Sequence, residues 1–313
     1  MRVITATDGL LPSPARVEPA ERAPLRVGAV QERWHPDPGE HEAALAAGIA
    51  AAAAHGARLV CLQELTLSRY FAVSPDGPRP GIEPEPLPDG PTFAFAAHAA
   101  ARHGVYVHAS LYERPERDDP GLGYNTAICV APDGSLVART RKLHLPVTAG
   151  YHEDRYFRPG DTGFPVVAIE QAAFGFPTCW DQWFPELARA YSLRGAEVLV
   201  YPTAIGSEPD HPGFDTAPLW QQVITGTGIA NGTFMVAVNR TGTEPGDPPI
   251  TFYGSSFISD PYGRVLVQAP RDEPAVLVAD LDLDARRDWL ALFPFLRTRR
   301  PDAYGPLVDD LDG

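Results

Sequence analysis

The stretch GEHEAALAAGIAAAAAHGARLVCLQE (residues 39–64) predicts a helix, a break and a strand in immediate succession. Alanine has the highest helix propensity, so residues 39–55 are expected to be helical, with Gly56 ending the helix. Residues 58–62 form a short apolar run that is typical of a strand. A similar run at residues 25–30 precedes the helix, so this part of the chain is predicted to be a strand–helix–strand unit.

Strands and helices continue to alternate along the rest of the chain. Residues 92–103 predict a helix ended by Gly104, and residues 105–112 alternate as a strand does. Pro132-Asp133-Gly134 is a turn signal between two strand-like runs, 125–130 and 135–140, and predicts a β-hairpin. Further strands are predicted at residues 166–169, 174–178, 198–201, 234–238, 251–258, 265–268 and 276–281, and further helices at 185–193, 217–231 and 284–290.

This order of elements predicts one α/β domain in which helices cover mixed sheets. The domain is expected over residues 25–292, because no Ser/Gly-rich linker or charge run divides it. Residues 1–24 are rich in proline and predict a mobile leader. Residues 293–313 combine Arg, Pro and Asp with scattered apolar side chains, which favours a C-terminal extension at a subunit interface.

Composition and charge narrow the classes of partner. The formal net charge of −14 argues against nucleic acid, which requires a basic face on the protein. No apolar run reaches the roughly 18 residues of a membrane span, and the first residues lack the apolar core of a signal peptide. The three cysteines include no CxxC pair, so no disulfide framework or zinc ribbon is predicted. We therefore expect a cytoplasmic protein with neither a membrane nor a nucleic-acid partner.

Three polar residues stand at the ends of predicted strands. Glu64 follows one apolar strand, Lys142 follows the hairpin, and Cys179 follows another apolar run, whereas Cys61 and Cys129 lie inside strands and are expected in the core. A thiolate attacks a carbonyl carbon, a carboxylate transfers protons, and an ammonium stabilises the developing negative oxygen. The set therefore suits acyl transfer, although these residue types are common and their spacing alone is a weak signal.

The residues around these three supply the specificity. The segments LQEL (62–65), RKLH (141–144) and TCWDQWFPE (178–186) resemble, in this order, the base, lysine and nucleophile segments of the nitrilase (carbon-nitrogen hydrolase) superfamily. Within that superfamily, the chain is most similar to N-carbamoylputrescine amidases. That similarity is carried by CWDQWFPE (179–186), GYHEDRYFRPGDTGF (150–164), YPTAIGSEP (201–209), NRTG (239–242) and ITFYGSSFI (250–258).

The resemblance implies a four-layer α-β-β-α sandwich that uses no metal or organic cofactor. It also implies hydrolysis of an N-carbamoyl amine to the amine, carbon dioxide and ammonia, through a thioester-type intermediate on Cys179. Glu64 matches the general base, Lys142 the lysine, and Glu153 a second glutamate that orients the lysine or the substrate. The nine histidines include no HExxH and no Cys/His spacing of a zinc site, so the residues themselves predict no metal either.

Contacts with the rest of the substrate are predicted from position and charge. A carbamoylated diamine keeps an ammonium, whose burial requires a carboxylate or an aromatic face. Glu208 or Asp210, in the loop after the strand that follows Cys179, is a candidate partner; the alternative is that both are solvated loop charges. Trp180 and Tyr70 are candidates for the aromatic surface. His144 either contacts the substrate or supports a loop.

Two departures from the family pattern leave other functions open. Residues 225–231 lack a histidine that such amidases often carry, and residues 172–177 differ from the usual approach to the nucleophile. The alternatives are a hydrolase of a different linear amide, an N-carbamoyl amino acid or a nitrile, and a catalytically silent relative that binds a metabolite or scaffolds other proteins. The presence of Glu64, Lys142 and Cys179 argues against the silent relative. The resemblance also implies a homo-oligomer.

Overall fold

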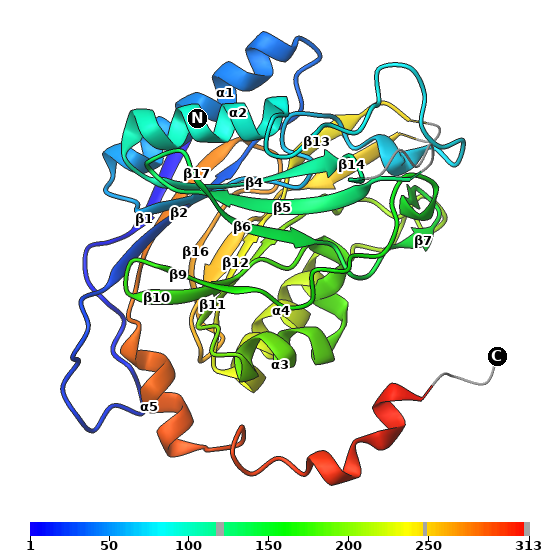
Figure 1. The fold of residues 1–313 in the computed structure, drawn as a ribbon. Coiled ribbons are helices and arrows are strands. Elements are labelled where there is room, and N and C mark those ends of the chain that lie inside the picture. The colour runs from blue at the N-terminus through cyan, green and yellow to red at the C-terminus, as the bar shows by residue number, and fades with distance from the viewer. Residues whose placement is uncertain (117–121, 247–248, 310–313) are drawn as a thin grey trace.

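The computed structural model describes residues 1–116, 122–246 and 249–309 of the 313-residue chain. Two β-sheets lie face to face, with helices on both outer sides (Figure 1). In order, the first sheet contains β1 (Arg2–Ala6), β17 (Ala275–Leu281), β2 (Leu25–Gln31), β3 (Leu59–Cys61), β4 (Tyr106–Glu113), β5 (Tyr124–Val130) and β6 (Leu136–Arg141). The second contains β16 (Val265–Gln268), β15 (Phe257–Ser259), β12 (Phe234–Val238), β11 (Val198–Pro202), β10 (Ala172–Gly175) and β9 (Val166–Ile169).

Helices cover the outer face of each sheet. Apolar side chains of α1 (Pro38–Ala54) and α2 (Pro91–His103) pack in one cluster with strands of the first sheet. Those of α3 (Pro185–Leu193) and α4 (Ala217–Asn231) pack with strands of the second. A third cluster, with side chains such as Leu59, Cys61, Phe174 and Val236, fills the space between the sheets. These layers confirm the predicted four-layer α-β-β-α sandwich.

The segment around α1 shows the physical basis of the predicted helix and strand. The Asp37 side chain accepts a hydrogen bond from the backbone N–H of Glu40 at 2.8 Å, and Pro38 occupies the first turn, so the helix begins with a satisfied cap. Gly56 follows it with a positive φ of 84°, which favours glycine. Strand β3 then pairs in parallel with β2 and β4, so the carboxyl ends of these three strands lie along the same side of the sheet.

Two strand predictions were wrong in detail. Residues 251–258 are not one strand but β14 (Ile250–Tyr253) and β15, because Gly254 and Ser255 adopt positive φ angles of 52° and 58° that turn the chain out of β-structure. The strand expected at 174–178 is β10, which ends at Gly175; Pro177 has no N–H to donate to a neighbouring strand. Strand β14 pairs with β13 (Thr241–Glu244), and β7 (Val147–Thr148) pairs with β8 (Tyr151–His152).

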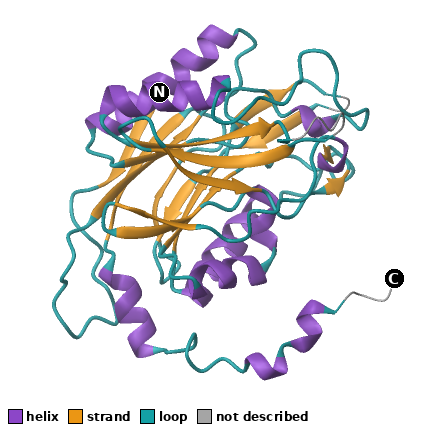
Figure 2. Ribbon diagram, in the orientation of Figure 1, coloured by secondary structure: helices purple, strands orange, loops and turns teal. Residues whose placement is uncertain are grey.

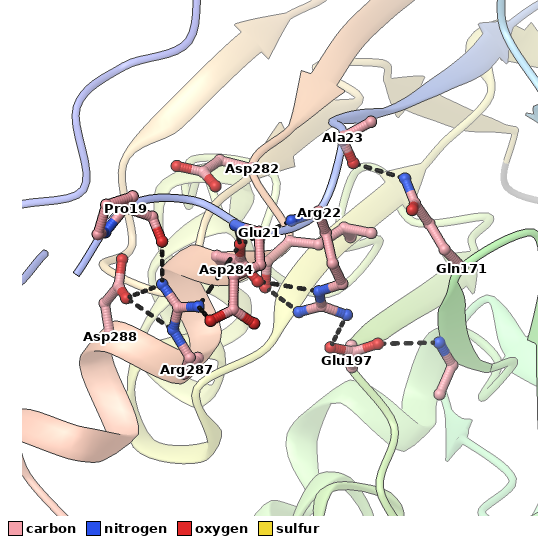
Figure 3. Close-up of polar contacts among 12 residues, drawn as sticks. Pro19, Glu21, Arg22, Ala23, Gln171, Glu197, Asp282, Asp284, Arg287 and Asp288 are labelled. Atoms are coloured by element: carbon pink, nitrogen blue, oxygen red, sulfur yellow. Dashed lines mark hydrogen bonds and ion pairs between the residues drawn. The ribbon is translucent and has the colours of Figure 1, made fainter.

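Residues 1–24, where we expected a mobile leader, begin with β1, an element that the sequence did not predict. It pairs in parallel with β17. Further along, the Arg22 guanidinium contacts Asp284 at 2.9 Å and Glu197 at 2.8 Å, and the backbone N–H groups of Glu21 and Arg22 donate to Asp284 (Figure 3). The segment thus joins α5 (Asp284–Leu292) to the second sheet.

Residues 293–309 leave the body of the protein after α5. They contain the short 3₁₀ turns η4 (Pro301–Ala303) and η5 (Gly305–Val308) and extend as an arm on the side of α3 and α4 (Figure 2). Several of their apolar side chains are exposed, including Phe293, Leu307 and Val308. Across the described residues, no helix combines the length and the apolar character that a membrane crossing requires.

Candidate active site

Glu64 lies just beyond β3, at the edge of the first sheet, and has no exposed surface. Its Oε1 accepts hydrogen bonds from Asn125 Nδ2 at 2.7 Å and from Lys142 Nζ at 2.9 Å. Its Oε2 is buried without a partner among the described residues. A buried oxygen without a partner is costly, so this atom is suited to receive a proton from a reacting group.

Lys142 follows β6 and is equally buried. Strand β6 is antiparallel to β5, which is antiparallel to β4, so β6 ends at the same edge as β3. Besides Glu64, its ammonium contacts both carboxylate oxygens of Glu153 at 2.7 Å. Burial lowers the pKa of Lys142, but Glu153 and Glu64 outweigh it and raise that pKa above its usual value, so the ammonium stays charged.

Glu153 lies in the 3₁₀ turn η2 (Glu153–Arg155), with no exposed surface. Tyr70 donates its hydroxyl to Glu153 Oε1 at 2.9 Å, so this carboxylate has partners on two sides. Burial raises the pKa of Glu153 and Lys142 opposes the rise. One ammonium between two carboxylates leaves a net negative charge in a buried space, which favours a proton moving onto the carboxylate pair during a reaction.

Cys179 opens the 3₁₀ turn η3 (Cys179–Trp183) after β10 and has a positive φ of 41°. A non-glycine residue in this region is strained, and such residues occur often at functional sites. Burial raises the pKa of the Cys179 thiol well above its usual value, and Glu64 adds to the rise, while Lys142 and the backbone N–H of Ala204 oppose it. The thiol is therefore protonated at neutral pH and needs a base to become a nucleophile.

Asp181 connects the cysteine turn to the lysine segment. One of its oxygens accepts from the Thr178 N–H at 3.0 Å, and the other accepts from both the backbone N–H and the ring Nδ1 of His144. The His144 ring also stacks on Phe184, with centroids 3.6 Å apart. His144 is thus tied into this loop, with 28% of its side chain exposed.

Glu208 and Cys179 both influence the same two phenols, Tyr151 and Tyr253. Burial raises the pKa of Tyr151, and the charges of Glu208 and Cys179 both contribute; the same two charges contribute at Tyr253. Glu208 is half-buried and accepts a hydrogen bond from Thr216 at 3.2 Å. Among the described residues, no arginine, lysine or histidine forms an ion pair with it.

The remaining predicted contacts lie at different depths. Trp180 is half-buried and packs edge-on against Trp183, while Asp210 is exposed. Tyr70 is 1% exposed and its hydroxyl is engaged by Glu153, so it supports that carboxylate. In the described part of the chain, no group of three or more His, Cys, Asp or Glu side chains has the arrangement of a metal site.

Two signals in the sequence were missed. Asn125 contacts Glu64, and an amide at the start of an otherwise apolar strand marks a position that packing alone does not explain. More telling, the 26 Lys and Arg residues include a single lysine, Lys142. Arginine supplies all the other permanent positive side-chain charge, so a single buried lysine indicates a need for a compact ammonium.

The chain is similar to known proteins in both sequence and fold. Residues 26–291 match the family model described as carbon-nitrogen hydrolase. The chain is 42% identical to an N-carbamoylputrescine amidase of Solanum lycopersicum over 83% of this chain and 87% of that protein. It is 37% identical to a citrullinase of Francisella tularensis over 91% and 99%. A carbon-nitrogen hydrolase structure from Helicobacter pylori G27 superposes with a TM-score of 0.81 and 32% identity over 92% and 99% of the two chains.

Proposed function

This chain belongs to the carbon-nitrogen hydrolase family, and from that premise we propose that it hydrolyses N-carbamoylputrescine or a closely similar carbamoylated diamine. The products are the diamine, carbon dioxide and ammonia. The observation that carries the proposal is the convergence of one buried ammonium and two buried carboxylates, Lys142, Glu64 and Glu153, beside the strained cysteine Cys179.

The proposed roles follow from these contacts. Glu64 takes the proton of Cys179 as the sulfur attacks the carbamoyl carbon, and Lys142 stabilises the negative oxygen that forms. Glu64 returns the proton to the nitrogen of the breaking C–N bond, so ammonia leaves and the acyl group stays on sulfur. Glu64 then activates a water that releases the carbamic acid, which decomposes to the amine and carbon dioxide. Glu153 holds the ammonium in place throughout.

The charge at the other end of the site favours a cationic substrate. Glu208 is the candidate partner for a distal ammonium, and its charge raises the pKa of Tyr151 and Tyr253, two phenols that Cys179 also influences. Arg271 stacks on Tyr253, with its guanidinium carbon 5.3 Å from the ring centroid, but Asp215 pairs with it through two hydrogen bonds of 2.8 and 2.9 Å. These two charges cancel, so Glu208 leaves this end negative.

Citrulline is the second candidate, because a relative that covers nearly its whole length is a citrullinase and because Arg271 lies next to Tyr253. Citrulline differs from N-carbamoylputrescine by one carboxylate on the carbon that bears the amine. If Arg271 releases Asp215 to bind that carboxylate, citrulline is the better substrate. The two candidates therefore differ in the charge that the far end of the site accepts, an ammonium alone for N-carbamoylputrescine and an ammonium together with a carboxylate for citrulline.

A panel of substrates tests the proposal. Ammonia release is measured with N-carbamoylputrescine, citrulline, N-carbamoyl-β-alanine and glutamine under identical conditions. We expect the highest kcat/KM for N-carbamoylputrescine. A higher value for citrulline favours the second candidate, and a higher value for glutamine or N-carbamoyl-β-alanine contradicts both.

We also propose that the protein is a cytoplasmic homo-oligomer in which residues 293–313 contribute to the subunit interface. The exposed apolar side chains of the arm, Phe293, Leu307 and Val308, support a partner surface, as do the exposed Leu193 of α3 and Leu219 of α4. All three cysteines are free and buried, which fits a reducing compartment.

A further inference from the structure

Arg240 is a fully buried arginine that the proposed chemistry does not use. It follows β12 by two residues, and its side chain has no exposed surface. One terminal nitrogen contacts Glu244 Oε1 at 2.5 Å. The other donates to the carbonyl oxygens of Glu64 at 2.6 Å, Ser68 at 3.2 Å and Leu65 at 3.3 Å. Its guanidinium therefore holds the backbone of the segment 64–68, which begins with the proposed base Glu64.

The backbone that Arg240 contacts is strained at Leu65. Leu65, the residue directly after Glu64, has a positive φ of 48°, which is unfavourable for a side chain with a Cβ atom. A strained backbone persists only when the surrounding structure holds it. The Arg240 hydrogen bonds to the carbonyls on both sides of this residue supply part of that hold, and the Leu65 N–H also donates to Ser110 at 3.1 Å.

Glu244 connects Arg240, through Tyr70, to the second carboxylate, Glu153. Its Oε2 accepts the backbone N–H of Tyr70 at 2.6 Å, and Tyr70 donates its hydroxyl to Glu153 at 2.9 Å. The Arg240–Glu244 pair thus holds the segment from Glu64 to Tyr70 at both ends. Each end leads to one of the two carboxylates that contact the Lys142 ammonium.

We propose that Arg240 and Glu244 are positioning residues that set the places of Glu64 and Glu153 around Lys142. This inference rests on the proposed function for its kinetic consequence, but its structural content concerns the environment of Lys142 and stands without any substrate. A displacement of about 1 Å at a reacting group costs roughly 100-fold in rate, so a loosened pair should lower kcat more than it raises KM.

The single lysine of the chain makes a direct test possible. Protein grown with lysine labelled by ¹³C at the ε position gives one lysine signal, which reports the environment of Lys142. The variants are Arg240→Gln and Glu244→Gln; the second keeps a carbonyl oxygen for the Tyr70 N–H and is the milder change. The matched control is Arg286→Gln, because Arg286 also donates to three backbone carbonyls, those of Asn231, Gly232 and Ser192, but contacts no residue of the site.

We expect the lysine signal to move in both test variants and to stay in place in the control. We also expect kcat for N-carbamoylputrescine to fall by about 10- to 100-fold in Arg240→Gln, less in Glu244→Gln, with KM within about threefold of wild type. The proposal is overturned if the lysine signal of Glu244→Gln and of folded Arg240→Gln matches that of wild type. It is also overturned if the test variants lose no more kcat, for the same fall in Tm, than the control Arg286→Gln does. If the lysine signal moves in the variants but the wild type itself hydrolyses no carbamoyl substrate, the positioning is supported and the proposed function is refuted.

Discussion

Replacing Lys142 by methionine should make the stability of the protein depend strongly on pH. In the wild type, one ammonium lies within 2.9 Å of Glu64 and 2.7 Å of Glu153, and none of the three side chains is exposed. Methionine has a similar length but no charge. Two buried carboxylates at one site cannot both ionise without a large penalty, so the variant keeps one proton on the pair in the folded state.

The sign and size follow from proton linkage. Burial raises the pKa of Glu153 to about 7 in the wild type against the opposing charge of Lys142, and removing that charge raises it further. When the folded pKa of a carboxyl lies above its unfolded pKa, the contribution of that group to the free energy of unfolding is greatest below the unfolded pKa. This contribution falls as the pH rises toward the folded pKa. The loss is about 1.4 kcal/mol for each pH unit below the folded pKa, hence at most about 3 kcal/mol from pH 7 to pH 9. For a chain of this length that is a further fall in Tm of at most about 5 °C.

Thermal unfolding followed by circular dichroism at pH 7, 8 and 9 measures this effect, with the wild type as the reference at each pH. The difference in Tm between wild type and Lys142→Met should widen as the pH rises. The same variant should lose about 100- to 1,000-fold in kcat, because the group that stabilises the negative oxygen is gone. A Tm difference that is constant from pH 7 to pH 9 would refute the idea that the ammonium is what allows both carboxylates to be buried.

Three other changes test the remaining assignments. Cys179→Ala should abolish ammonia release with little change in Tm, and activity above a few per cent contradicts its role as nucleophile. Glu64→Gln should lower kcat by about 100-fold or more, and activity near the wild-type level contradicts its role as base. Glu208→Gln, alone and with Asp210→Asn, should raise KM for a carbamoylated diamine but not for a neutral carbamoyl alkylamine of equal length, and equal effects on both would mean that this loop does not bind the ammonium. Deleting residues 293–313 should reduce the oligomer observed by light scattering, and an unchanged oligomer would place the interface elsewhere.

The backbone conformation at two positions shows where the site depends on the rest of the fold. Cys179 and Leu65 both adopt positive φ angles, and one is the proposed nucleophile while the other follows the proposed base. Neither is a glycine, so neither position is marked in the sequence as a left-handed turn. Contacts from Asp181 to the Thr178 N–H and from Arg240 to the Leu65 carbonyl lie next to these positions.

The sequence alone was enough to predict the layers of the fold and the family, and both predictions are confirmed. Local signals carried most of this: the alanine run before Gly56, the Pro132-Asp133-Gly134 turn and the apolar runs between them. Motif order supplied the family. The errors fall where local signals are ambiguous, as at Gly254, where the chain leaves β-structure inside a run that reads as one strand.

Only the tertiary structure decided which charges meet. Lys142 and Glu64 are 78 residues apart, and Arg240 reaches the Glu64 carbonyl across 176 residues. Contacts of this kind arise because strands from both sheets end at one edge, and propensity or periodicity along the chain carries no information about which strand ends are neighbours. Charge alone would have put Arg240 and Lys142 on the surface with most basic residues. They are buried because carboxylates and backbone carbonyls converge on them from distant segments and compensate for the water they lose.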